Sequence, residues 1–231
     1  MIEVRGLSHR YGEALALDSV SISIADGEFV VLAGPNGSGK TTLVRHWNGL
    51  LDPDAGEVLV NGLAVEEDLV AARSAIGMVF QNPRDGFVAA RVDADVAFGP
   101  ENLGLAREEI DRRVEEALAA VNLTGRNEDR IETLSGGEQE RLAIAGALAM
   151  EPDHLVLDEP FTGLDAFARE SVLDRLEALS REGTSVVVVT HDLRDVLELA
   201  DRLVVLSSGR VVRDEPPESV GLEGLGVRPP C

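Results

Sequence analysis

The chain has 231 residues, which is enough for one domain, or for a core with a subdomain, that buries a sizeable interior. Its 42 acidic and 21 basic residues give a net charge of -21, and a negative field of this size repels nucleic acid and anionic lipid headgroups, so the composition argues against direct binding to either. The acidic excess, the near absence of lysine and the aromatic share of 3% resemble proteins from salt-accumulating organisms, in which high ionic strength screens the self-repulsion.

Several stretches within residues 1–62 have the sequence patterns of β-strands. Val20, Ile22 and Ile24 alternate with serines, which is the period of a strand buried on one face. The pair at 26–27, Asp-Gly, then turns the chain into the continuous apolar run of residues 29–33. We therefore expect residues 1–27 to begin a partly antiparallel sheet, and residues 56–62 to form another strand that closes on a turn.

The stretch after residue 33 fits G-x-x-x-x-G-K-[ST] and lies between an apolar run and a helix-like segment, the context that this motif requires. Its glycines let backbone N–H groups point inward at an anion, and the following helix adds the positive end of its dipole. We predict a phosphate cradle in which Lys40 bridges the β- and γ-phosphates and Thr41 ligates Mg²⁺. The alternative is a Gly-rich turn without a ligand. The cradle comprises Gly34, Pro35, Asn36, Gly37, Ser38, Gly39, Lys40, Thr41 and Thr42.

Lys40 is the one lysine of the chain, beside 20 arginines. A compact ammonium fits among phosphate oxygens where a planar guanidinium would not, which supports the phosphate cradle independently of the motif.

From residue 75 the pattern changes to short, wholly apolar strands separated by helices, at residues 76–80, 154–157, 186–189 and 203–206. Strands that are apolar on both faces predict a parallel sheet covered by helices. Strands vanish between residues 89 and 149. There Ile110, Val114, Leu118 and Val121 fall on one helical stripe, and residues 142–150 continue as a second apolar helix, so we expect a helical insertion. Only the tail from Asp214 looks loosely structured.

Polar side chains follow the predicted central strands: Gln81, the pair Asp158 and Glu159, and His191. In open α/β sheets ligands collect at the carboxyl ends of the strands. Asp158 suits Mg²⁺ held through its water shell, and Glu159 is then free to deprotonate an attacking water. His191 would sense the γ-phosphate and steady the water. The alternatives are a solvated acidic turn, a structural histidine and an ordinary polar residue after a strand.

A second motif is Leu134-Ser135-Gly136-Gly137-Glu138-Gln139. Ser135 and Glu138 have the spacing of a capping box that opens a helix running through Met150. Two glycines inside a capped helix start would cost stability for nothing unless backbone N–H groups must approach another group closely. We therefore predict a second anion-binding helix end, far in sequence from the first.

With these motifs the chain resembles an ATP-binding cassette (ABC) ATPase over residues 2–216. The resemblance implies an α/β P-loop NTPase (RecA-like) core, formed by residues 1–88 and 151–231 and including an antiparallel β-subdomain, with a helical subdomain at 89–150. It implies ATP and Mg²⁺ as ligands, Tyr11 as the aromatic that stacks on adenine, and the D-loop around Asp165. Catalytic roles would fall to Glu159, His191 and Gln81, magnesium binding to Thr41, Gln81 and Asp158, and signature contacts to Ser135, Gly136, Gly137 and Glu138.

The family also implies the partner of the second anion site. Two cassettes pair head to tail, as a homodimer or a heterodimer, and the signature helix of one faces the γ-phosphate held by the other. ATP binding closes the pair and hydrolysis reopens it.

A narrower likeness, to the energy-coupling factor branch, appears at residues 79–83, 95–105 and 143–150. It implies uptake of cobalt, nickel or a vitamin such as biotin through a transmembrane coupling subunit and a substrate-binding membrane subunit. Residues 84–87, Arg-Asp-Gly-Phe, depart from the more acidic, Gln-containing run of that branch. The position of Glu138 is also often occupied by glutamine in the signature motif of the family. The alternatives are another ABC transporter class, a soluble ABC protein acting on nucleic acid or ribosomes, and a P-loop kinase.

The remaining features concern the compartment. Cys231 is the one cysteine, so no intrachain disulfide can form and a reducing compartment fits. No apolar run approaches the roughly 18 residues of a membrane span, and the start of the chain lacks the basic residues of a signal peptide. We expect a peripheral protein at the cytoplasmic face of the cell membrane.

Overall fold

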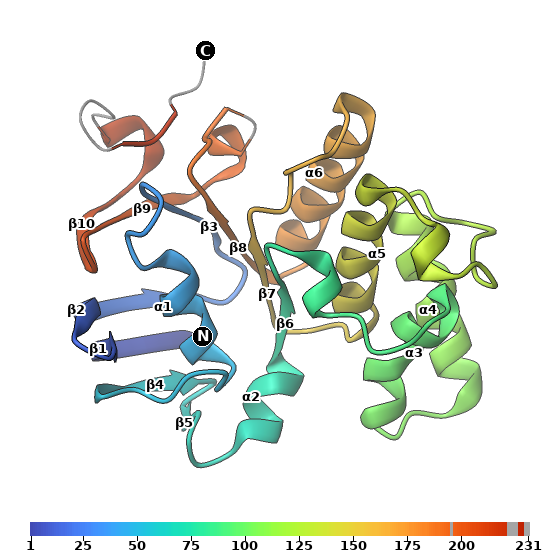
Figure 1. Cartoon of the computed structure of the whole chain (residues 1–231), viewed down its shortest axis with the longest axis horizontal. Helices are drawn as coiled ribbons and strands as arrows, with labels where there is room; N and C mark the ends of the chain where they lie inside the picture. Colours follow the sequence, from blue (N-terminus) through green and yellow to red (C-terminus); the bar gives the residue numbers. More distant parts are fainter. Residues whose placement is uncertain (195, 221–225, 229–231) are drawn as a thin grey trace.

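Two β-sheets make up the strands of the computed structural model, which describes residues 1–194, 196–220 and 226–228 (Figure 1). The smaller sheet has the order β2-β1-β4-β5, and all its pairs are antiparallel. Val20, Ile22 and Ile24 are buried and the serines between them are exposed, which confirms the predicted half-buried strand. The strands are β1 (Ile2–Tyr11), β2 (Ala14–Ile24), β4 (Ala55–Val60) and β5 (Leu63–Ala64).

The larger sheet has the order β10-β9-β3-β8-β7-β6, in which only the β10 pair is antiparallel. It confirms the predicted parallel sheet, although β6 ends one residue before Phe80. The expectation of a loose chain from Asp214 is wrong at its start, because Asp214 and Glu215 pair with β9. The strands are β3 (Phe29–Ala33), β6 (Ile76–Val79), β7 (His154–Asp158), β8 (Ser185–Thr190), β9 (Arg202–Ser207) and β10 (Arg210–Glu215).

The larger sheet separates two hydrophobic cores, which explains why its central strands are buried and apolar on both faces. Val30 and Leu32 pack with the smaller sheet and α1, whereas Phe29 and Val31 pack with α3, α4, α5 and α6. Successive residues of a strand point to opposite faces, so an uninterrupted apolar run is required wherever both faces are covered.

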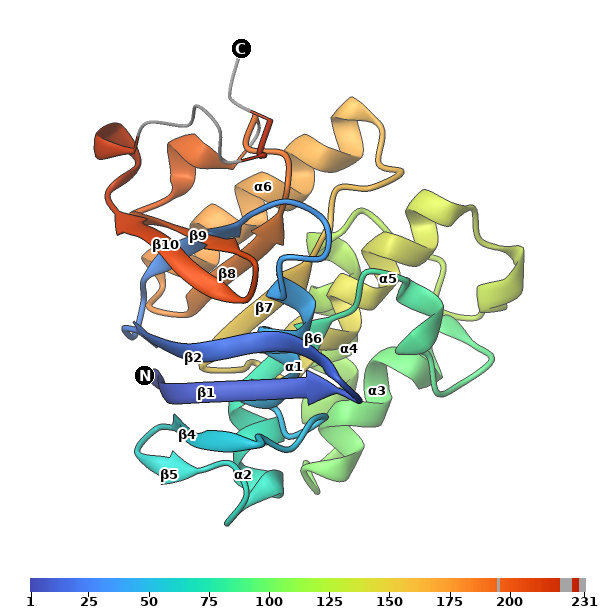
Figure 2. The same cartoon turned by 60° about the vertical axis from the view of Figure 1, so that its left-hand side comes forward.

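Helices cover both faces of the larger sheet. Figures 1 and 2 show α3, α4 and α5 gathered beside β6, at the opposite end of the sheet from β10. The predicted stripe is found on α4, where Ile110, Val114 and Leu118 are buried, while Val121 is the buried residue that caps the helix. The helices are α1 (Lys40–Trp47), α2 (Leu69–Ala75), α3 (Val92–Asn102), α4 (Arg107–Ala120), α5 (Gly136–Ala149) and α6 (Ala166–Arg181).

Four short 3-10 helices complete the secondary structure that the described residues show: η1 (Pro83–Asp85), η2 (Ile131–Thr133), η3 (Leu197–Leu199) and η4 (Pro217–Ser219). Among the residues described, no helix has both the length and the apolar character needed to cross a membrane. Cys231 lies outside the described residues.

Candidate active site

The predicted groups emerge side by side because their strands are neighbours. In the order β3, β8, β7 and β6, the carboxyl ends carry the phosphate loop, His191, the acidic pair at 158–159 and, two residues beyond its strand, Gln81. A cavity of about 430 Å³ lies at this edge. Its lining comprises Tyr11, Ala16, residues 36–42, Gln81, Asp158 and Glu159.

Glycine is required at two positions of the phosphate loop. Gly34 has φ +148°, and a Cβ there would lie 2.1 Å from the Leu206 carbonyl oxygen. Gly39 has φ +104°, and a Cβ there would lie 2.7 Å from the Ala16 carbonyl oxygen. Gly39 also precedes α1 without any side-chain cap, so the first N–H groups of this helix receive no acceptor from a capping residue.

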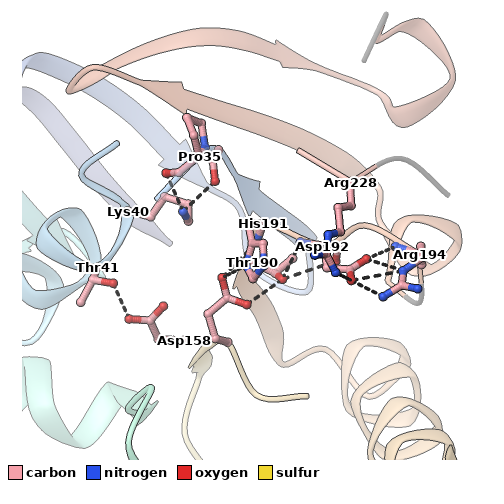
Figure 3. Close-up of polar contacts among 11 residues, drawn as sticks. Pro35, Lys40, Thr41, Asp158, Thr190, His191, Asp192, Arg194 and Arg228 are labelled. Atoms are coloured by element: carbon pink, nitrogen blue, oxygen red, sulfur yellow. Dashed lines mark hydrogen bonds and ion pairs between the residues drawn. The ribbon is translucent and has the colours of Figure 1, made fainter. Parts of the chain in front are cut away.

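Lys40 lies folded onto the loop that it belongs to. Its Nζ donates to the carbonyl oxygens of Gly34 at 2.8 Å and Pro35 at 3.2 Å (Figure 3). Burial lowers the pKa of Lys40, while the charges of Glu159 and Asp158 oppose that shift. The ammonium is therefore held by neutral carbonyl oxygens, which a stronger anionic acceptor can replace.

Thr41 and Asp158 meet across the site. The Thr41 hydroxyl donates to Asp158 Oδ2 at 2.6 Å (Figure 3), and burial raises the pKa of this carboxyl group. A hydroxyl and a carboxylate beside the amide of Gln81 form a set of hard oxygen donors, which is the ligand type that Mg²⁺ prefers. The residues present therefore fit a magnesium ion.

Glu159 follows β7 in an unusual conformation. Its φ is +53°, and its N–H donates to the Val189 carbonyl at 2.8 Å, so the residue stays attached to β8 beyond the end of its own strand. Its Oε1 accepts the His191 N–H at 3.0 Å and lies 2.6 Å from His191 Nδ1. Left-handed conformations in residues other than glycine are sparsely populated and concentrate at functional sites.

Thr190 is the residue of this group that sequence reasoning missed. Its hydroxyl donates to Glu159 Oε2 at 3.0 Å, and its side chain is buried. A hydroxyl that ends a strand of valines, directly before His191, was the available signal, but a threonine is common in strands and its direction is decided by the pleat.

The second predicted anion site lies elsewhere. The Ser135 hydroxyl caps α5 by accepting the Glu138 N–H at 3.3 Å, and Glu138 Oε2 accepts the Ser135 N–H at 2.8 Å. These two hydrogen bonds confirm the capping box. Asp165 likewise caps α6 by accepting from the Ala168 N–H at 2.8 Å. None of these residues lines the 430 Å³ cavity, and Figure 1 shows α5 on the far side of β6 from α1.

The structure thus brings one group of predicted residues together and leaves another apart. The phosphate loop, Asp158, Glu159, His191 and Gln81 share one edge. Tyr11 stands half exposed at the cavity there, which residues 36–42, Asp158, Glu159 and Gln81 also line, whereas His191 is not part of the lining. The residues that stay apart from this edge are Ser135, Gly136, Gly137, Glu138 and Asp165.

Comparison with known sequences gives consistent matches. A family model described as ABC transporter matches residues 17–162. The chain is 68% identical, with 100% of both sequences covered, to a protein of Halobacterium salinarum assigned to the ABC transporter ATP-binding proteins, in agreement with the salt-adapted composition. It is 44% identical to the energy-coupling factor transporter ATP-binding protein EcfA of Methanothermobacter thermautotrophicus, covering 94% of this chain and 71% of that protein. It is also 44% identical to the cobalt import ATP-binding protein CbiO of Syntrophus aciditrophicus, covering 99% and 82%.

Solved structures agree in fold. CbiO1 of Clostridium perfringens, described as part of the ABC transporter complex cbiONQ, superimposes with a TM-score of 0.84 at 34% identity, covering 96% of this chain and 90% of that one. The ATP-binding cassette MJ0796, solved as a dimer in a post-hydrolysis state with ADP and phosphate, gives a TM-score of 0.86 at 31% identity, covering 95% and 100%. These neighbours confirm the predicted P-loop NTPase fold.

Proposed function

The chain belongs to the ABC transporter family of ATP-binding proteins, and we propose that it is the ATP-hydrolysing subunit of an energy-coupling factor importer. The observation that carries the chemistry is the shared edge of four neighbouring strands, where a phosphate loop faces two carboxylates, a histidine and a glutamine. The relatives named EcfA and CbiO support the branch, and the cobalt import protein supports a metal ion as the cargo.

In this proposal each residue at the edge has one task. Lys40 exchanges the carbonyl oxygens of its own loop for phosphate oxygens of ATP. Thr41, Asp158 and Gln81 would hold Mg²⁺, which would neutralise charge on the phosphates. Glu159 accepts the proton of the attacking water while His191 orients the γ-phosphate, and Tyr11 stacks on adenine.

The signature motif supports a second cassette as partner. Gly136 has no atom within 4 Å of a Cβ built on it, and one built on Gly137 would make only ordinary contacts, at 3.5 Å from the Gly163 carbonyl oxygen. Among the residues that the structure describes, nothing therefore requires glycine at either position. Glycine weakens a helix by about 1 kcal/mol relative to alanine, so we infer that a group from outside the chain needs close access to the N–H groups of α5. The phosphates bound by another cassette meet this description.

A membrane partner is supported by an apolar depression between β6 and the helices α3 and α5. A cavity of about 190 Å³ is lined there by Phe80, Phe87, Phe98 and Met150, among others. Val88 and Phe98 are 58% and 47% exposed at its rim. Large exposed apolar side chains around a hollow favour a protein contact, and we assign this surface to the coupling subunit. The chain then acts as a peripheral protein at the cytoplasmic face of the membrane.

The test of the chemistry is release of free phosphate from ATP and Mg²⁺ without any acceptor, measured in molar salt. General-base catalysis contributes about 10²-fold or more, so Glu159→Gln should lower the rate by at least that factor while ATP still binds. Hydrolysis at the wild-type rate in this variant would contradict the role of Glu159.

The test of the partner is Ser135→Arg, which places a cation and bulk at the start of α5. Since Ser135 is exposed and distant from the cavity, ATP binding should persist while hydrolysis is abolished. Hydrolysis that survives this substitution would contradict completion of the site by a second cassette. Co-purification with the membrane subunits, followed by identification of the bound solute, would establish the cargo.

A further inference from the structure

The hydroxyl of Thr190 connects Glu159 to the segment that follows β8. It donates to Glu159 Oε2 at 3.0 Å and accepts the Asp192 N–H, also at 3.0 Å. Thr190 is 2% exposed, so water does not compete with these contacts. The position of the Asp192 backbone therefore determines where the Thr190 hydroxyl, and through it one oxygen of Glu159, is held.

Residues 226–228, which we call the C-terminal brace, hold the backbone on both sides of Asp192. The Arg228 N–H donates to the His191 carbonyl at 2.9 Å, and the Leu193 N–H donates to the Arg228 carbonyl at 3.0 Å. These two bonds form a parallel bridge between Asp192 and Arg228. Figure 3 shows Arg228 beside Asp192, and the two side chains approach to 3.8 Å.

The C-terminal brace also reaches the phosphate loop. Gly226 has φ +68°, and a Cβ built on it would lie 3.1 Å from Pro35 Cβ. Glycine is therefore favoured there by the backbone conformation, and a side chain would press closely on the loop. Val227, between these two contacts, packs against the core beneath the larger sheet. Three consecutive residues thus bridge the phosphate loop and the segment that carries His191.

We propose that Thr190 is a positioning residue for Glu159, and that the C-terminal brace holds it in place by fixing the backbone of residues 191–193. The inference rests on the proposed function of Glu159 as the base. The physical reason is that Oε1 of Glu159 is already shared by two contacts from His191, so Thr190 decides the orientation of the remaining oxygen. An acceptor for a water proton works only within a narrow range of positions.

The first test compares Thr190→Val with Thr190→Ser. Valine has nearly the shape of threonine but no hydroxyl, and we expect kcat to fall about 10-fold with the KM for ATP unchanged. Serine keeps the hydroxyl and should retain at least half of the wild-type kcat. A Thr190→Val enzyme at the wild-type rate, or equal losses in both variants, would overturn the role of Thr190.

A double variant shows whether Thr190 acts through Glu159. In the Glu159→Gln background, adding Thr190→Val should cause no further loss of single-turnover rate, because both changes remove the same contribution. Independent, additive losses would overturn the inference. Wild-type hydrolysis by Glu159→Gln alone would instead refute the proposed base, so the two failures are distinguishable.

The second test removes one bond of the C-terminal brace. Arg228→Pro lacks the N–H that donates to His191, and we expect kcat to fall about 5-fold with ATP binding unchanged. Arg228→Ala is the matched variant, since it loses the side chain but keeps the N–H, and it should retain most of the rate. Equal rates in the two variants would overturn the role of the C-terminal brace.

Discussion

The two helix starts that were predicted to bind anions, those of α1 and α5, are built in opposite ways. Helix α1 follows Gly39, which is left-handed and offers no capping side chain, and a Cβ at Gly34 or Gly39 would lie too close to a backbone carbonyl oxygen. Helix α5 follows Ser135 in a complete capping box, and a Cβ added at Gly136 or Gly137 would meet no close contact from the described part of the chain. The conformation at the start of α1 therefore depends on contacts with distant segments, whereas the start of α5 is stabilised by hydrogen bonds between residues three positions apart.

This difference indicates where the requirement for glycine comes from in each case. In the phosphate loop a side chain would collide with the chain itself, so the fold and the ligand impose the same sequence. In the signature motif the described part of the fold would accept alanine, so we propose that the requirement comes from a molecule that is not part of the chain. The following predictions test this contrast, in order of their expected effect on the free energy of unfolding.

Substitution of Gly34 should have the largest effect. Gly34→Ala puts a Cβ 2.1 Å from the Leu206 carbonyl in a left-handed conformation, and we expect a loss of about 4 kcal/mol from strain and overpacking together. Chemical denaturation at constant molar salt measures it. Gly37→Ala is the matched control and should cost less, because Gly37 has positive φ but a Cβ there would have no atom of the described residues within 4 Å. Equal losses in the two variants would show that φ, rather than contact with β9, sets the requirement.

The next effect concerns the buried groups near each helix start. Lys40 in α1 has two carbonyl partners, whereas Glu140 Oε1 in α5 is buried with no hydrogen-bond partner among the described residues. Burial raises the pKa of Glu140 to about 7 from its ordinary value of 4.5. Between pH 4.5 and pH 7 the folded state binds more protons than the unfolded state, so the free energy of unfolding falls as the pH rises. The stability contributed by the protonated Glu140 carboxyl is therefore fully present below about pH 4.5 and is lost as the pH rises through 7.

The loss amounts to about 3 kcal/mol for a shift of this size. Urea titrations at several pH values between 4.5 and 8 give the free energy of unfolding of the wild type and of Glu140→Gln. We expect it to fall with rising pH in the wild type, and the variant to lack the part of this fall that Glu140 causes. The exposed Glu132→Gln serves as the control for the change in net charge. Parallel pH profiles for the wild type and Glu140→Gln would contradict the assignment.

Removal of the cap on α5 should have a smaller effect. Ser135→Ala deletes the acceptor for the Glu138 N–H, and loss of such a cap costs about 1 kcal/mol. Denaturation midpoints report the change. Ser135→Asp, which restores an acceptor at the cap, should recover most of the stability, and a failure to recover would indicate that packing rather than capping is lost.

Gly136→Ala should have the smallest effect on stability, and its sign should be opposite. Alanine is the better helix former, so the free energy of unfolding should stay the same or rise by up to about 1 kcal/mol. Hydrolysis should nevertheless fall about 10-fold, because the added methyl group obstructs approach of an external anion to the helix start. Unchanged hydrolysis in a stable Gly136→Ala protein would remove the basis for an external requirement.

Much of the fold could be predicted because its signals are local. The serine alternation in β2 and the stripe on α4 reflect the periods of a strand and a helix, and the uninterrupted burial of the apolar runs in β7 and β8 reflects a sheet covered on both faces. The error at Asp214 arose because β10 is an exposed edge strand whose charged residues carry no such period. Pairing with β9 through backbone bonds makes it a strand, and composition does not report that pairing.

The candidate site divides in the same way. Lys40, Thr41, Asp158, Glu159 and His191 could be selected from the sequence, since each stands in a motif or directly at a strand end. The contacts among these residues could not be predicted from the sequence. Thr190 and Glu159 are 31 positions apart, and they meet because β7 and β8 are adjacent, in register, and deliver their last residues to one edge.

The sequence by itself determined the phosphate-loop motif, the capped start of α5, the alternation in β2 and the apolar runs of the larger sheet, because these depend on neighbours within a few positions. The tertiary structure alone decided that the order β3, β8, β7 and β6 gathers one half of the site and leaves the α5 start outside it. It alone brought residues 226–228 against Pro35 and His191. The physical reason is that such contacts join segments far apart in the chain, and the packing of the two cores on a shared sheet fixes which segments meet.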